Sequence, residues 1–400
     1  MENDEYKIIA KRGNLSLAVK NQNADITNIF EKAVLLDENG EVALDNILVG
    51  SALKRGYWEP VDFDENKHIE NNNPVRNALI GAAVGDAYGV PYEFLFREKI
   101  AKVLKDDMVG SDTNIDFSSP WGNEIPAGAW SDDTSMIVAA MNSMVNKQGI
   151  DYEDIMDQFI SWWDDKKYTS LDEPFGLGST VDKALNKARA GVPALECGGT
   201  DFQDNGNGAL MRILPFSMFC IINNVPDDDM VDIIKKGSSI THAHDISKMA
   251  CVMYTVFLKN IISTKNKEKA YYRMQNFNYE DYFDEETISH FSRIFNDELS
   301  YYSIKESGYV VDTLEGALYS VMNASNYEST VKNAVKIGYD TDTTACVAGS
   351  LAGALYGHSD IPERWLDKLK KQDYLDRLSK RFMVLDNAYE RAKESGKKKS

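Results

Sequence analysis

The sequence predicts an all-α main domain, a compact globule of many helices, preceded by a small mixed α+β module. Apolar residues recur at spacings of three and four in one segment after another of the main domain, and alternating Val/Ile-rich runs are scarce there. A change of pattern near Asn72 separates the module from it. We therefore expect residues 1–72 as an N-terminal extension, 73–390 as the main domain and 391–400 as a basic, flexible tail.

The first 72 residues carry mixed signals. KIIAKRG and NLSLAVK alternate apolar and polar residues in the manner of strands, whereas GEVALDNILVGSALKRG is mixed. The polar, turn-prone stretch ENKHIENNNP follows, and in it Asn73 precedes Pro74. A cap residue followed by proline in the first turn is a good helix start, so the main domain is expected to begin here.

The main domain reads as one helical segment after another. Residues 264–312 are acidic and tyrosine-rich, which fits a lid or a peripheral helical insertion. The helices predicted from the apolar spacing include 74–89, 134–148, 152–165, 182–190, 245–262, 311–324 and 341–357.

The composition limits the partners. The 400 residues are 43% hydrophobic and 27% charged, as is ordinary for a soluble globular protein. The net charge of −19 comes from 44 basic and 63 acidic residues and argues against nucleic acid or a membrane surface, since both need basic patches. The start lacks the apolar core of a signal peptide, and the four cysteines form no CxxC pair. The sequence therefore predicts a cytoplasmic protein with buried free thiols.

Two polar clusters, each at the expected start of a helix, carry the strongest chemical signal. The first is Ser131-Asp132-Asp133-Thr134, which taken alone is also explained by helix capping. The second, residues 340–344 (DTDTT), has more polar residues than a cap needs. Carboxylates flanked by hydroxyls suit a hard divalent cation, and converging acidic side chains would repel one another without it. Two such clusters favour a binuclear magnesium or manganese site.

The first predicted helix of the main domain combines small residues with a carboxylate. Gly81, Gly85 and Gly89 lie on one face of it, which implies close packing against a neighbour. Asp86 lies among them, and a carboxylate on a tightly packed helix needs a partner. A proline then ends the helix and leaves Glu93 on a loop.

In two further segments the polar residues could have either a binding role or a structural one. Asn-Gly pairs in residues 204–212 (DNGNGALMR) mark tight turns whose backbone amides could cradle a diphosphate, a plain turn being the alternative. His242 is one of only five histidines, and a structural role is the alternative to a functional one. The sequence has no zinc-spaced His/Cys cluster, P-loop or GxSxG motif.

Together these segments resemble the ADP-ribosylglycohydrolase family, which includes the dinitrogenase reductase-activating glycohydrolases. The matching motifs are GDAYGVPYE, WSDDT, FGLGST, NGNGALMR, THAHD and GYDTDTTACVAGSLAGALYG followed by IPERW. They occur in the family's order between residues 75 and 370. The resemblance implies a compact all-α ADP-ribosylglycohydrolase-like domain that binds two divalent cations, Mg²⁺ or Mn²⁺.

The resemblance also implies roles for single residues. Glu93 falls where family members place a catalytic loop glutamate, and Asp204 matches an acidic residue implicated in some members. Residues 1–70 have no counterpart in the family. The implied metal ligands are Ser131 (where Thr is common), Asp132, Asp133, Asp340, Asp342 and Thr343, and the implied substrate-binding positions are Asp86, Gly178, Ser179, Asn207, Gly208 and His242.

The resulting prediction is a metal-dependent hydrolase that releases ADP-ribose from a modified protein side chain, arginine first, or from a small ADP-ribose derivative. Glu93 or Asp204 would carry the proton. The alternative is a catalytically inactive ADP-ribose-binding or toxin-neutralising (immunity) protein of the same fold. Such a protein should have lost ligands, whereas all six expected positions carry oxygen donors here. An enzyme that is also an immunity factor, with residues 1–72 docking a toxin or target protein, is a third reading.

Overall fold

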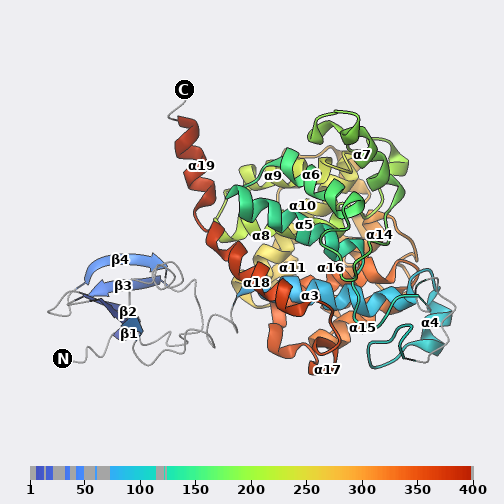
Figure 1. The fold of residues 1–400 in the computed structure, drawn as a ribbon, viewed down its shortest axis with the longest axis horizontal. Helices are drawn as coiled ribbons and strands as arrows, with labels where there is room; N and C mark the ends of the chain where they lie inside the picture. The colour runs from blue at the N-terminus through green and yellow to red at the C-terminus, as the bar shows by residue number, and fades with distance from the viewer. Residues whose placement is uncertain are drawn as a thin grey trace. The chain divides into compact units, whose positions relative to one another are not determined.

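The computed structural model describes residues 6–12, 15–20, 32–36, 42–48, 59–60, 73–113, 121 and 124–397 (Figure 1). Contacts between residues divide the chain into two units, Met1–Pro74 and Val75–Ser400.

The described residues of the first unit form an antiparallel sheet of strand order β4-β3-β2-β1-β5. The register of the first pair joins Tyr6 to Lys20 and Arg12 to Leu15. These two strands cover the alternating segments KIIAKRG and NLSLAVK, and the rest of the expected α+β module lies largely outside the described residues. The strands are β1 (Tyr6–Arg12), β2 (Leu15–Lys20), β3 (Lys32–Leu36), β4 (Val42–Leu48) and β5 (Glu59–Pro60).

All named secondary-structure elements in the described residues of the second unit are helices, which confirms the all-α prediction for the main domain. Seventeen α-helices follow one another: α3 (Pro74–Gly89), α4 (Arg97–Val103), α5 (Asp132–Lys147), α6 (Tyr152–Asp164), α7 (Ser179–Arg189), α8 (Leu214–Ile222), α9 (Asp227–Ser239), α10 (Asp245–Thr264), α11 (Lys267–Gln275), α12 (Glu285–Ser289), α13 (Ser292–Phe295), α14 (Val310–Met322), α15 (Tyr327–Ile337), α16 (Thr341–Tyr356), α17 (Glu363–Leu366), α18 (Gln372–Phe382) and α19 (Ala388–Lys397). The 3₁₀ turns between them are η2 (Val90–Tyr92), η3 (Ala194–Glu196), η4 (Phe202–Asp204), η5 (Leu210–Arg212), η6 (Tyr279–Asp281), η7 (His358–Asp360) and η8 (Met383–Leu385).

Two segments of uncertain character in the sequence are helical. The acidic stretch 264–312 contains α11, α12 and α13 joined by turns, and its role as a lid or a peripheral insertion stays a prediction. Residues 391–397, which we expected in a flexible tail, form the C-terminal part of α19, and residues 398–400 lie outside the described part of the chain.

Helix α16 lies in the middle of the helical unit and crosses α3 at very short range (Figure 1). A methyl group added to Gly81 would lie 2.3 Å from the carbonyl oxygen of Gly349, and one added to Gly85 would lie 2.0 Å from that of Ala345. The two backbones touch with no side-chain layer between them. The close packing predicted from the glycine spacing is confirmed, and it fixes the start of α16 against the end of α3.

Helix α10 is the second element at the centre of this unit (Figure 1). It is long and apolar enough to cross a membrane, but 72% of its apolar window is buried within the unit, which is the packing of a core helix. The four cysteines are buried and free, as the sequence predicted: Cys197, Cys220, Cys251 and Cys346.

Candidate active site

Three segments far apart in the sequence meet at one place in the helical unit: the starts of α5 and α16 and the loop after α3. The Thr343 hydroxyl donates to Asp133 Oδ1 at 3.2 Å, which joins the two predicted polar clusters directly. One carboxylate oxygen from each of Glu93, Asp340 and Asp342 lies within 4.8 Å of the others. Glu93, Asp133, Asp340 and Asp342, which the sequence singled out, therefore belong to one convergent group.

Asp86 is the residue that holds the start of α5 in place. Its fully buried carboxylate accepts hydrogen bonds from the amide of Ser131 at 2.9 Å and from the amide and hydroxyl of Thr134 at 3.1 and 2.6 Å. Ser131 itself caps α5, because its hydroxyl accepts from the amide of Asp133 at 3.3 Å. These contacts supply the partner that Asp86 needs. Its contact with a substrate stays a prediction.

The start of α16 is organised differently. Asp340 occupies the N-cap position, yet its side chain makes no capping hydrogen bond. Its Oδ2 instead accepts from the side-chain amide of Asn207 at 2.9 Å, and the same amide nitrogen lies 2.9 Å from the hydroxyl of Thr313. Helix capping therefore does not account for this carboxylate, which faces the convergent group.

The loop that carries Glu93 is tied to the residue before the α16 cluster. The amide of Phe94 donates to the carbonyl of Tyr339 at 2.6 Å, and the amide of Tyr339 donates to the carbonyl of Leu95 at 2.7 Å. Phe94 and Tyr339 both have left-handed backbones, with φ of 64° and 65°. The indole N–H of Trp121 donates to Glu93 Oε2. Together these contacts aim the Glu93 carboxyl at Asp340 and Asp342.

Burial and mutual repulsion make these carboxyls weak acids. Burial first, and then the charge of Asp340, raise the pKa of Glu93 to about 8. Burial and the charges of Glu93 and Asp86 raise the pKa of Asp132 well above its usual value. Burial and the charges of Glu93 and Asp133 likewise raise the pKa of Asp342 well above its usual value. Burial raises the pKa of Asp86 to about 6, against the opposing effect of its hydrogen-bond donors. The group is therefore costly to ionise as it stands.

Two oxygens of the group lack partners. Asp133 Oδ2 and Asp342 Oδ1 are buried and accept no hydrogen bond from the described residues. Buried carboxylate oxygens of this kind are costly unless a cation or a donor meets them, and oxygen donors are what hard divalent cations prefer. Asp133 also forms a second close set with Asp86 and Cys346. The chain thus contains acidic groups that fit a divalent metal ion.

The FGLGST segment borders the acidic group through a glycine. Gly176 has φ of +90°, and a methyl group there would lie 2.2 Å from Asp132 Oδ1. Gly178 and Ser179 are exposed at the start of α7, so the two residues predicted to bind substrate lie just beyond this contact. The ring of Phe175 lies 5.6 Å from that of Trp121, which links this segment to the loop of Glu93.

The Asn-Gly turn meets the loop of His242. A methyl group on Gly208 would lie 2.9 Å from His242 Cε1, and the ring of His242 is 1% exposed. The Asn207 amide donates to the carbonyl of Gly308 at 3.0 Å, so this amide is already used within the protein. Asn207, Gly208 and His242 therefore lie together, and Asn207 connects them to the acidic group through Asp340.

Asp204 stands apart from the acidic group. Its carboxylate lies 3.4 Å from Lys183 Nζ and accepts from the amide of Asp201 at 3.3 Å. It belongs to neither of the two close sets of potential ligands found among the described residues. Of the two predicted catalytic carboxyls, Glu93 is the one that the structure brings together with Asp340 and Asp342.

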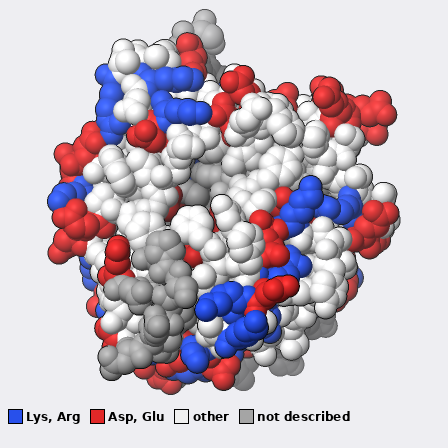
Figure 2. Space-filling model, turned by 90° about the vertical axis from the view of Figure 1, so that its right-hand side faces the viewer, with Lys and Arg blue, Asp and Glu red and all other residues white. Residues whose placement is uncertain are grey.

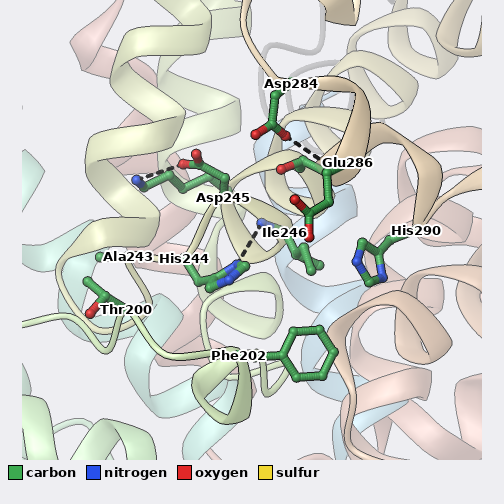
Figure 3. A pocket seen from close by; sticks show the side chains of 11 residues that line it. Thr200, Phe202, Ala243, His244, Asp245, Ile246, Asp284, Glu286 and His290 are labelled. Atoms are coloured by element: carbon green, nitrogen blue, oxygen red, sulfur yellow. Dashed lines mark hydrogen bonds and ion pairs between the residues drawn. The ribbon is translucent and has the colours of Figure 1, made fainter.

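A pocket of ≈ 570 Å³ lies beside the Asn-Gly turn and the start of α10 (Figure 3). The Phe202 ring, 55% exposed, stands at its edge, with the rings of His290 and His244 at 5.9 and 6.2 Å. Figure 3 shows the carboxylates of Asp284 and Glu286 on the opposite side. The pocket combines aromatic surfaces with hydrogen-bond acceptors.

The outer surface of the protein is hollowed near the centre of the face in Figure 2. Uncharged residues form most of the wall of this hollow, while Lys, Arg, Asp and Glu gather toward the outline.

Sequence reasoning did not assign three of these residues. Trp121 was missed because a lone tryptophan in a polar loop has no signature of its own. Gly176 lies inside the quoted motif FGLGST, and its role depends on a positive φ that spacing does not reveal. Phe202 sits next to the DNGNG motif, and an aromatic residue beside such a turn was the available signal.

The comparisons with known proteins identify the family. A family model described as ADP-ribosylglycohydrolase matches residues 68–394. The chain belongs to the ADP-ribosylglycohydrolase family. This match confirms the resemblance drawn from the motifs, and with it the assignment of the chain to an enzyme family.

Several relatives within the ADP-ribosylglycohydrolase family cover most of the chain. An ADP-ribosylarginine hydrolase Tri1 of Serratia proteamaculans (strain 568) is 30% identical over 328 residues, which are 79% of this chain and 80% of the relative. The ADP-ribosyl-[dinitrogen reductase] glycohydrolase of Rhodospirillum rubrum is 30% identical over 73% of this chain and 88% of its own. A solved ADP-ribosylglycohydrolase-related protein complex superposes with a TM-score of 0.64 at 26% identity, covering 79% of this chain and 99% of that one.

Proposed function

We propose that this protein is a metal-dependent hydrolase that releases ADP-ribose from an ADP-ribosylated arginine side chain of a protein. The observation that carries the proposal is the meeting of the α5 and α16 carboxylates with Glu93. The arginine linkage is supported by the similarity to an ADP-ribosylarginine hydrolase.

Two divalent cations, Mg²⁺ or Mn²⁺, are the proposed cofactors. Asp133 Oδ2 and Asp342 Oδ1, which accept no hydrogen bond from the described residues, would contact the cations directly. The residues that would hold the cations are Ser131, Asp132, Asp133, Asp340, Asp342 and Thr343. Bound cations would neutralise the repulsion within the group and supply Lewis-acid charge to ribose oxygens and water.

Glu93 is the proposed proton carrier. Hydrolysis adds one water across the glycosidic bond, so that its oxygen joins the anomeric carbon and a proton passes to the departing nitrogen. Glu93 Oε2 is held by the indole of Trp121, and its pKa of about 8 lets it hold or release a proton near neutral pH. Asp204 is the weaker candidate, because its carboxylate already pairs with Lys183 and lies outside the acidic group.

Two neighbouring surfaces would bind the nucleotide part of the substrate. The pocket beside Phe202 offers aromatic faces on which a base could stack and the carboxylates of Asp284 and Glu286, which could accept hydrogen bonds from an exocyclic amine (Figure 3). The Asn-Gly turn, which contacts Asp340 through Asn207, would then lie beside the diphosphate.

The test is a release assay on defined linkages. The full-length protein is incubated with arginine-, serine- and nucleic-acid-linked ADP-ribose, each with Mg²⁺ and after chelation. We expect metal-dependent release from the arginine-linked substrate. Release from another linkage only would refute the arginine assignment, and full release after chelation would refute the metal. Binding of ADP-ribose without release from any of them would favour the inactive binding protein.

A further inference from the structure

Arg212 is a fully buried cation whose hydrogen-bond acceptors among the described residues are two carbonyls and a hydroxyl, with no carboxylate among them. Its guanidinium donates to the carbonyls of Gly237 and Ser238 at 3.0 and 3.4 Å and to the hydroxyl of Thr241 at 2.6 Å. It also lies 5.0 Å from the ring centre of Phe159. A buried charge without a counter-ion is costly, so this cation depends on the acceptors around it, and the shortest of these bonds is to Thr241.

The hydrogen bond from Arg212 to Thr241 decides whether Thr241 donates to His242 or accepts from it. A guanidinium can only donate, so the Thr241 oxygen accepts from Arg212. Thr241 is fully buried, and its oxygen lies 2.9 Å from His242 Nδ1. The Thr241 hydroxyl has one proton, and among the described residues His242 Nδ1 is the acceptor for it. If Nδ1 were the donor, the buried hydroxyl proton would have no acceptor among the described residues, which is the costlier arrangement.

The consequence for His242 is a defined tautomer. Burial and the charge of Arg212 lower the pKa of His242 to about 3, against the opposing effect of the Asp204 charge, so the ring is neutral at physiological pH and carries one proton. With Nδ1 accepting, that proton resides on Nε2. This edge of the ring faces the Asn-Gly turn, because methyl groups on Gly208 and Gly206 would lie 3.3 and 3.7 Å from Nε2.

We propose that Arg212 and Thr241 are positioning residues that hold His242 in the Nε2–H tautomer and so present a fixed hydrogen-bond donor to an oxygen of ADP-ribose above Gly206 and Gly208. The tautomer follows from contacts within the protein alone. Only the identity of the acceptor rests on the proposed function.

His244 provides an internal reference two residues away. Its Nδ1 accepts from the amide of Ile246 at 3.3 Å at the start of α10 (Figure 3). It should therefore also carry its proton on Nε2, through a bond that involves neither Arg212 nor Thr241. We call the hydrogen bonds from Arg212 to Thr241 and from Thr241 to His242 the relay. A substitution of Thr241 that acts through the relay should alter the tautomer of His242 and leave that of His244 unchanged.

The experiment reads the tautomer directly by nitrogen NMR of the histidine rings in the ¹⁵N-labelled full-length protein. Neutral imidazole gives distinct signals for the protonated and unprotonated nitrogens. The His242 signals are assigned by their loss in His242→Asn. Thr241→Val removes the hydroxyl while keeping the side-chain shape, and Thr241→Ser restores it. Unchanged His244 signals show that the loop is folded in each variant.

We expect an unprotonated Nδ1 in the wild type and in Thr241→Ser, and mixed tautomers in Thr241→Val. ADP-ribose affinity, measured by calorimetry, should fall about tenfold in Thr241→Val and recover in Thr241→Ser. A protonated Nδ1 in the wild type would overturn the relay. Mixed His242 tautomers in Thr241→Val together with an unchanged ADP-ribose affinity would overturn the role of the tautomer in ligand binding. If the wild type does not bind ADP-ribose, both the proposed function and the role of His242 at the ligand are refuted. The nitrogen signals of the His242 ring still show in that case which tautomer is present.

Discussion

Glu93 carries a carboxyl that its surroundings keep from ionising easily. It lies close to Asp340 and Asp342, one of its oxygens takes the indole proton of Trp121, and its pKa is raised to about 8. A carboxyl with these properties is suited to proton transfer near neutral pH. Asp204, by contrast, lies outside this group and is paired with Lys183.

Glu93→Gln should therefore reduce turnover about a hundredfold or more while leaving ADP-ribose affinity close to normal. The amide keeps the shape of the side chain but cannot carry the proton. Single-turnover kinetics and calorimetry on the same preparation separate the two effects. Glu98→Gln, at an exposed position on the same segment, is the matched control. Near-normal turnover in Glu93→Gln would shift the role to Asp204.

Asp342→Asn tests the metal assignment at a single oxygen. Asp342 Oδ1 is buried and accepts no hydrogen bond from the described residues, so this residue should contribute directly to cation binding. We expect a loss of activity of at least about a hundredfold and a smaller rise in melting temperature on adding Mg²⁺. In chelator, the variant should melt no lower than the wild type, because a repelling charge is gone. Asp367→Asn, on the exposed surface, should behave as wild type in all three measurements.

At the scale of elements, the α3–α16 crossing sets the position of the acidic group. Gly85→Ala would place a methyl group 2.0 Å from the carbonyl oxygen of Ala345. We expect it to lower the free energy of unfolding by about 2–3 kcal/mol, and the melting temperature by several degrees. Gly149→Ala is the control, because a methyl group there meets nothing within 4 Å. Equal melting temperatures for the two variants would show that the helices can separate at little cost.

The helices were predictable because each has a local signal. The apolar spacing marked α10 and α14, and Asn73 before Pro74 marked the start of α3. The polar clusters were predictable for the same reason, since DTDTT has more oxygen donors than a cap requires. The pairing of elements was not. That Asp86 would hold α5, or that Asn207 would contact Asp340, depends on contacts 45 to 133 residues apart, which no local pattern encodes.

For the whole molecule, the raised carboxyl pKa values make stability depend on pH. Between about pH 6 and about pH 8 the folded protein retains protons on Glu93 that the unfolded chain, with a pKa near 4.5, has released. The metal-free protein should therefore lose stability as pH rises through this window. Melting temperatures measured in chelator should fall from pH 6 to pH 8, and Mg²⁺ or Mn²⁺ should reduce that fall. A melting temperature that rises over the same range in chelator would contradict the assignment.

The N-terminal extension can be tested by removal. Every candidate site residue lies after Asn72, and contacts divide the chain at Pro74. A shortened chain beginning at Asn72 should fold and hydrolyse a small ADP-ribose substrate at a rate near that of the full chain. A folded but inactive product would show that residues 1–72 contribute to the active site. Docking of a toxin or target protein through this segment stays a prediction, and comparing the two chains on a modified protein would test it.

The α3–α16 crossing also constrains how this family member can change in evolution. Contacts at Gly81 and Gly85 repeat every four residues along α3, so the two helices fit in one register only. Inserting a single residue would turn everything beyond it by about 100° and carry Asp86 away from α5. Lineages can exchange side chains around this crossing, but changes of length must accumulate elsewhere. The helical stretch at residues 264–312 lies outside this crossing, so a change of length there would leave the register of α3 and α16 intact.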